Sequence, residues 1–209
     1  MKKLIVIAMA VGMSFICYAE QVVYNDKGDK ILLSDDGTWK FLERNKASSG
    51  KIKVNKTKYT KGKKSTYVLN SKKNDVAVWL DPDKWGFSAS KNNDEAEYSF
   101  ILKGQDLHGL LISEAIEIKI ETLIDIALEN AKRAAPDARI VSKEYRTVNG
   151  LKLVQMNILG TIQGIKFSYL GYYYSNSKGT TQLLTFTSEN LYPKYKEEAE
   201  KLLNGLMLQ

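Results

Sequence analysis

Apolar and polar side chains follow two different periods along residues 67–209. Between 118 and 135 the apolar positions recur every three or four residues, which predicts an amphipathic helix that ends before Pro136. Alternation in steps of two then predicts four strands in series, at 138–148, 151–159, 165–174 and 180–187. A closing helix is expected from Pro193 onward, because one face of that segment is apolar.

Short turn signals separate the predicted strands. Asn149-Gly150 is a strong two-residue hairpin signal, and residues 176–179 form the next turn. Consecutive strands joined by tight turns are antiparallel. Shorter strands are also expected before the first helix, at 67–69, 76–80, 97–102 and 107–113. The pattern predicts an α+β fold, in which helices pack on an antiparallel β-sheet.

The sequence pattern of residues 20–43 predicts a small β-hairpin or meander unit. Three strand-like runs occur there, and Asp36-Gly37 supplies a tight turn. Apolar residues share one face of this unit: Ile31, Leu33, Trp39 and Phe41. A unit of two or three strands is marginally stable in water by itself. We therefore expect it to dock on the main domain or on a partner.

Residues 44–66 carry nine basic side chains and no acidic one, whereas the whole chain has a net charge of +7. Their apolar content is low, so we expect a basic flexible linker between the two folded parts. One interpretation is that the linker contacts an anionic lipid or polymer surface of the cell envelope. The candidate contacts are Lys51, Lys53, Lys56, Lys58, Lys61, Lys63 and Lys64. The alternative is a tether whose charge only keeps it solvated.

The first 19 residues have the pattern of a cleavable signal peptide. Two lysines precede an apolar run at 4–16, and Cys17-Tyr18-Ala19 forms a small-x-small cleavage site. Cleavage after Ala19 would remove the only cysteine and place the protein in the periplasm or outside the cell. An uncleaved anchor and a lipid on Cys17 are the alternatives. Export also argues against a nucleic acid as partner.

Few residues suggest catalysis or a cofactor. His108 is the only histidine, and no G-x-S-x-G, phosphate-loop or dinucleotide motif is present. One histidine is too few for a histidine-based metal site, and the acidic turns lack the spacing of a calcium loop. We therefore assign no catalytic, cofactor-binding or metal residue and expect no enzyme. Paired carboxylates of an extracytoplasmic hydrolase remain the alternative, although no pair is singled out.

Tyrosines are concentrated in the strand predicted at 165–174. In an extended strand Tyr172 and Tyr174 lie on one face and Tyr173 on the other. Tyrosine suits protein interfaces, so Tyr172 and Tyr174 are a candidate interface. The alternative is that they cover a sheet face beneath a helix.

Several motifs resemble those of the PsbP-like group of α/β/α sandwich domains. They are VWLDPDKW at 78–85, the Asn149-Gly150 hairpin, and YLGYYY at 169–174 followed by QLLTFT at 182–187. The resemblance spans about residues 67–209. It implies a non-catalytic extracytoplasmic accessory or binding protein, and it transfers no site residue. Residues 20–43 are similar to short DGTW hairpins that precede exported bacterial domains.

Three functions are therefore compared. The leading hypothesis is an exported, non-enzymatic accessory or binding protein of the envelope whose ligand is unknown. The second is the carboxylate hydrolase. The third is a structural envelope protein that residues 44–66 hold at anionic surfaces.

Overall fold

The chain forms two separate units, Met1–Asn45 and Lys46–Gln209. In this computed structural model the described residues are 21–24, 30–34, 36–43, 52–91 and 95–209. The predicted signal peptide at 1–19 and the first candidate lysine, Lys51, lie outside them. Each unit is described by itself.

The first unit is a three-stranded antiparallel meander in the order β1-β2-β3. Its strands are β1 (Gln21–Tyr24), β2 (Lys30–Leu33) and β3 (Trp39–Glu43). The carboxylate of Asp36 accepts hydrogen bonds from the Thr38 amide at 2.8 Å and hydroxyl at 2.6 Å. Trp39 is 59% exposed, and its ring meets that of Phe41 edge-on at 5.3 Å. The predicted strands are present, and the pairing of Ile31 with Phe41 and of Leu33 with Trp39 places these four residues on one face.

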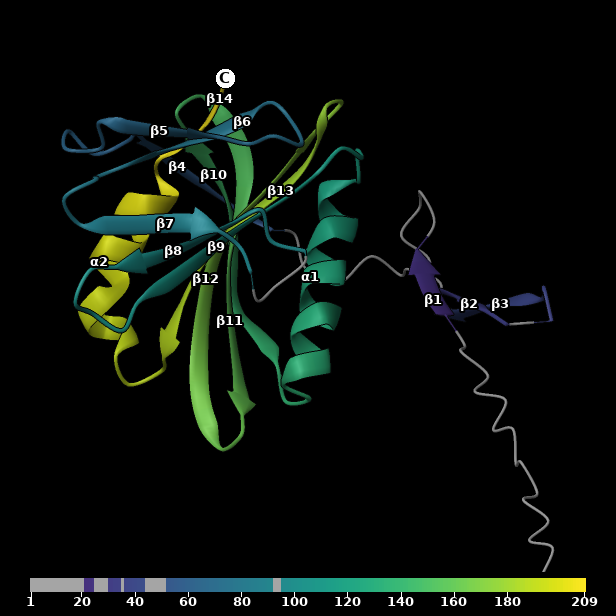
Figure 1. The fold of residues 1–209 in the computed structure, drawn as a ribbon. Helices are drawn as coiled ribbons and strands as arrows, with labels where there is room; N and C mark the ends of the chain where they lie inside the picture. The colour runs from purple at the N-terminus through teal and green to yellow at the C-terminus, as the bar shows by residue number, and fades with distance from the viewer. Residues whose placement is uncertain (1–20, 25–29, 35, 44–51, 92–94) are drawn as a thin grey trace, which may run out of the picture. The chain divides into compact units, whose positions relative to one another are not determined.

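An eight-stranded sheet forms the centre of the second unit (Figure 1). Its strand order is β4 (Lys53–Tyr59), β10 (Arg139–Val148), β11 (Leu151–Ile162), β12 (Ile165–Asn176), β13 (Gly179–Ser188), β9 (His108–Glu114), β8 (Tyr98–Leu102) and β7 (Trp85–Ala89). Every neighbouring pair is antiparallel except β4 and β10, which run parallel.

Two helices lie on opposite sides of this sheet (Figure 1). The first, α1 (Ile120–Ala134), packs on β10, β11 and β12, whereas α2 (Tyr192–Leu203) packs on β12, β13 and β6. The α2 side also carries a small sheet of β14 (Leu206–Leu208), β6 (Val76–Leu80) and β5 (Tyr67–Asn70), in that order. The predicted α+β sandwich is therefore present.

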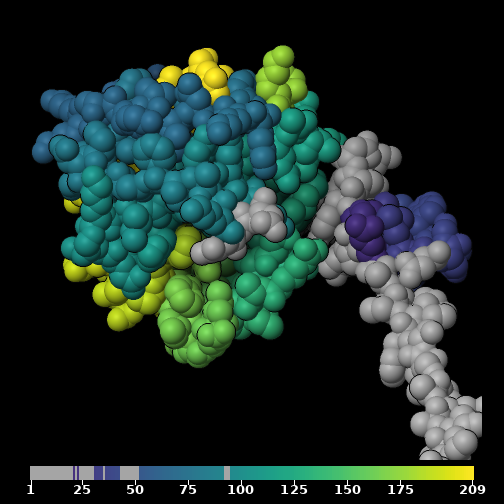
Figure 2. All heavy atoms as spheres, viewed as in Figure 1, coloured from purple at the N-terminus to yellow at the C-terminus, as the bar shows by residue number. Residues whose placement is uncertain are grey.

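The hairpin of β11 and β12 extends beyond the helices. Its tip, light green in Figure 2, stands out from the body of the unit. Gln163 there has a φ of 50°, and Asn149 in the β10–β11 turn has a φ of 48°. Both turns thus use the left-handed backbone that two-residue hairpins require. In the described ranges, neither helix is long and apolar enough to cross a membrane.

For residues 52–66, strand β4 corrects the expectation of a flexible linker, whereas residues 44–51 of that segment lie outside the described ranges. Lys53 pairs with Glu144 in β10, and Tyr59 pairs with Val148. Asn55 donates a hydrogen bond of 3.0 Å to the Glu144 carboxylate, and Tyr59 packs on the core. An edge strand needs only a few buried side chains and tolerates lysines on its open side. The low apolar content of the segment therefore did not exclude a strand.

Candidate functional site

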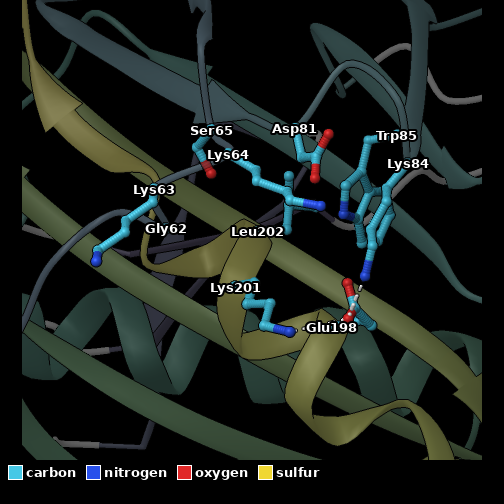
Figure 3. A pocket seen from close by; sticks show the side chains of 10 residues that line it. All are labelled: Gly62, Lys63, Lys64, Ser65, Asp81, Lys84, Trp85, Glu198, Lys201 and Leu202. Atoms are coloured by element: carbon cyan, nitrogen blue, oxygen red, sulfur yellow. Dashed lines mark hydrogen bonds and ion pairs between the residues drawn. The ribbon is translucent and has the colours of Figure 1, made fainter.

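A basic hollow of about 260 Å³ opens beside α2 in the second unit. The loop after β4, the turn between β6 and β7, and α2 all contribute to its lining (Figure 3). Four lysines line it against two carboxylates, so its charge is positive. These residues are Lys63, Lys64, Lys84, Lys201, Asp81 and Glu198.

Local hydrogen bonds fix the two loops that form the hollow. The Ser65 amide donates to the Gly62 carbonyl at 3.0 Å, and the Lys61 ammonium donates to the Ser65 carbonyl at 3.1 Å. The same ammonium lies 4.3 Å from the centre of the Trp79 ring, a cation–π arrangement. In the second loop, the Trp85 amide donates to the Asp81 carbonyl at 2.9 Å. The lysines in these two loops are therefore held on short turns with defined backbone hydrogen bonds.

The floor of the hollow is apolar. Trp85, the first residue of β7, is 3% exposed, and Leu202 on α2 is 1% exposed. Both belong to the main hydrophobic core. A rigid apolar floor excludes water from one side of the lysines and strengthens their electrostatic interactions.

Glu198 forms ion pairs with two of the lysines that line the hollow. Its Oε1 lies 2.6 Å from the Lys84 ammonium and 3.0 Å from that of Lys201 (Figure 3). Burial raises the pKa of Glu198, but the hydrogen bonds from Lys84 and Lys201 more than offset this, so the pKa lies below its usual value. Glu198 is therefore ionised at neutral pH. Lys201 also pairs with Glu197 at 2.8 Å.

Two of the lining lysines, Lys63 and Lys64, have no counter-ion among the described residues. Lys63 and Lys64 are both exposed, and neither has an ion-pair partner within the described part of the chain. Figure 3 shows the Lys64 side chain running across the hollow toward Trp85, whereas that of Lys63 points away. Of the two, only Lys64 is thus placed to meet a bound anion.

The other candidate lysines lie elsewhere. Lys53, Lys56 and Lys58 are exposed on β4, and Lys61 is engaged with Ser65 and Trp79. Of the candidate lysines that the structure describes, Lys63 and Lys64 are therefore the two that line the hollow. Sequence reasoning missed Lys84 and Lys201, because neither is near residues 44–66 in the sequence.

Burial argues against Tyr172 as an interface residue. Its side chain is 0% exposed under α2, and its hydroxyl donates to the Asn204 side chain at 2.7 Å. Arg146 donates to the same hydroxyl at 3.3 Å. Tyr174 is half-buried at the edge of this core. The alternative interpretation, that these tyrosines cover a sheet face beneath a helix, describes Tyr172 well.

Little in the described residues supports the hydrolase alternative. Asp81 and Glu198 line the same hollow, but a general acid needs a raised pKa and that of Glu198 is lowered. His108 lies 3.2 Å from Asp106 and stacks on Phe186 at 5.5 Å. No group of three or more His, Cys, Asp or Glu side chains in the described ranges could hold a metal ion.

Comparisons with known proteins identify the fold. No family model and no curated protein match the chain. Cyanobacterial PsbP (CyanoP) from Synechocystis sp. PCC 6803 is 12% identical, with 71% of this chain and 95% of that chain covered at a TM-score of 0.56. LpqN of Mycobacterium tuberculosis, described as involved in cell envelope biogenesis, is 10% identical over 68% and 90% of the two chains, with a TM-score of 0.46. This chain therefore has a PsbP-like fold.

Proposed function

We propose that the protein is an exported, non-catalytic binding or accessory protein of the cell envelope that holds a phosphate-type anion in the basic hollow. The observation that carries the proposal is the convergence of Lys64, Lys84 and Lys201 above an apolar floor. Of these, Lys64 has no ion-pair partner among the described residues.

Glu198 leaves the lysines able to bind an anion. An ammonium group has three N–H donors, and Lys84 gives one of them to Glu198. Glu198 therefore positions Lys84 and Lys201 without using all their donors. Lysine binds phosphate as a compact point charge, which suits a ligand that approaches from the open side of the hollow. The excess of lysines over carboxylates in the lining keeps the site attractive to an anion.

Export and the absence of catalysis are parts of the same proposal. The residue pattern at 1–19 supports export. Glu198, a partly buried carboxylate of the hollow, is held ionised by two lysines, which favours a positioning role over acid catalysis. The phosphate group could belong to a lipid headgroup or to a soluble or polymeric phosphate. These sources share one chemistry and are separated by experiment.

Vesicle binding tests the hollow directly. Protein that lacks residues 1–19 should co-sediment with vesicles of phosphatidylglycerol and phosphatidylcholine more strongly than with phosphatidylcholine alone, and less strongly as salt is added. Lys64→Gln should weaken this binding about fivefold, because one lysine near an anionic surface contributes about 1 kcal/mol. The matched control is Lys56→Gln, which removes the same charge from β4, outside the hollow.

The outcomes distinguish binding in the hollow from nonspecific attraction between a positively charged protein and an anionic surface. Equal weakening by Lys56→Gln and Lys64→Gln would contradict a site and leave only diffuse attraction. A titration with glycerol 3-phosphate, followed by NMR, forms the second arm. Shifts at Lys64 and Trp85 with the soluble phosphate, without vesicle binding, would assign the site to a free or polymeric phosphate. Binding in neither arm would refute the proposal.

A further inference from the structure

A second cavity of about 260 Å³ lies on the other face of the sheet, beside α1. Helix α1 packs on β10, β11 and β12, while the lining also includes residues of β13 and β9 beyond the helix. Ala131 on α1 and Leu184 and Phe186 on β13 are among the lining residues. We call this cavity the apolar cleft.

Small side chains on α1 leave the cleft open. Ala127, Ala131 and Ala134 line it at helical spacing. After the helix the chain lies close to β11, because a Cβ added at Gly160 would come within 2.9 Å of the Ala135 Cβ. The helix is thus held near β11 while its small side chains do not fill the space toward β13.

The hydroxyl of Tyr173 is one hydrogen-bond donor that the cleft offers to a ligand. Tyr173 lines the cleft and is 2% exposed, and burial alone raises its pKa. Its hydroxyl has no hydrogen bond within the described part of the chain. A Cβ added at Gly171 would lie 3.0 Å from Tyr173 Cε2 and 3.2 Å from the hydroxyl oxygen, so the ring runs over Gly171. A hydroxyl that lines a cleft and lacks a protein partner is free to donate to the acceptor oxygen of a ligand.

The charge of the lining defines the ligand further. Among the described residues, no lysine, arginine or histidine lines the cleft, and the polar lining groups are the side chains of Asn130, Gln182, Glu95 and two tyrosines. An anion would find no counter-ion here, in contrast to the basic hollow. The Tyr169 ring stacks on Phe186 at 5.5 Å and extends the apolar lining across two strands.

We propose that the apolar cleft binds a neutral, mainly apolar small molecule whose single acceptor oxygen receives a hydrogen bond from Tyr173. Pockets of this kind, apolar with a few converging polar groups, are typical of small-ligand sites. The proposal is independent of the basic hollow, because the two cavities share no lining residue.

Titration of the full-length protein with 1-octanol, followed by ¹H–¹⁵N NMR, tests the cleft. Shifts should concentrate at Ala131, Gly171 and Leu184. Ala131→Leu should weaken binding about tenfold or more, because the added side chain fills the cavity while leucine remains a good helix former. Tyr173→Phe should weaken octanol binding about threefold to tenfold through the lost hydrogen bond.

The controls make each result decisive. Arg133→Leu adds the same leucine on an exposed position of α1 outside the cleft and should leave the affinity unchanged. Octanoate should bind more weakly than octanol, since none of the described lining residues carries a positive charge. Shifts that map elsewhere, or an Ala131→Leu affinity equal to wild type, would overturn the proposal. Octanoate binding as tight as octanol would overturn the neutral ligand class, and an undiminished Tyr173→Phe affinity would overturn the role of that hydroxyl.

Discussion

Asn149 joins three segments of the second unit through one side chain. Its amide nitrogen donates to the carbonyls of Asn204 and Leu206, both at 2.8 Å, and its side-chain oxygen accepts from the Lys61 amide at 3.1 Å. The residue also occupies the left-handed region that asparagine tolerates better than most residues. A hairpin turn is thereby tied to the loop after β4 and to the end of α2.

Replacing this side chain should be costly. Asn149→Ala removes three hydrogen bonds and leaves partly buried backbone groups unpaired, so we expect a loss of about 2–4 kcal/mol in the free energy of unfolding. Chemical denaturation measures it. The control is Gln163→Ala, whose backbone φ of 50° is nearly the same. A similar loss for both variants would mean that backbone strain, and not the three bonds, explains the effect.

The sequence indicated the turn at Asn149 but not its contacts. An Asn-Gly dipeptide is a local signal, whereas Lys61 and Asn204 are far from it in the chain. Tyr172 shows the same limit. The alternation of side chains along the strand predicted the face on which Tyr172 lies. Its burial could not be predicted, because it depends on α2, which reaches that face only through tertiary contacts. Lys84 and Lys201 likewise meet only after folding.

At the scale of elements, β4 covers a buried charge. Arg146 on β10 keeps only 9% of its side chain exposed and pairs with Glu144 at 2.6 Å. Its guanidinium lies 4.5 Å from the centre of the Tyr59 ring, and Asn55 shares the Glu144 carboxylate. A buried ion pair needs such additional partners to offset its desolvation. Asn55 and Tyr59 lie in the segment that was expected to be a linker, and they are partners of this ion pair.

The melting temperatures of two truncated chains test whether β4 stabilises the second unit as a strand or is a dispensable linker. The fragment 46–209 should melt at the same temperature as the full-length chain, because it retains the whole second unit. The fragment 67–209 lacks β4 and should melt about 10 °C lower, since a loss of a few kcal/mol shifts a domain of this size by that amount. Circular dichroism measures both. Equal melting temperatures for the two fragments would restore the flexible-linker interpretation.

On the scale of the whole molecule, two of the cavities of the second unit differ in character, and each lies beside one helix. The basic hollow borders α2, and the apolar cleft borders α1. The fold class, both helices and the consecutive hairpins were predictable, because local periodicity and turn residues specify them. The pairing of β9 with β13 and the separate sheet of β5, β6 and β14 were not, because pairing between distant strands has no local signal.

Export concerns the whole chain and has a simple test. Amino-terminal sequencing of protein recovered from the periplasm or the medium should begin at Glu20, since the pattern at 1–19 predicts cleavage after Ala19. A sequence that starts at a lipid-modified Cys17, or an intact amino terminus, would contradict cleavage at this position.

The small sheet has a consequence for the timing of folding. Leu206 in β14 pairs with Val78 in β6, and the Trp79 amide donates to the Gly205 carbonyl at 2.9 Å. Contacts between such distant residues form slowly and need both ends of the segment to be present. The second unit therefore cannot complete its core until its last residues have been synthesised. Until then the edge of β6 that pairs with β14 has no partner strand, so this side of the core stays incomplete.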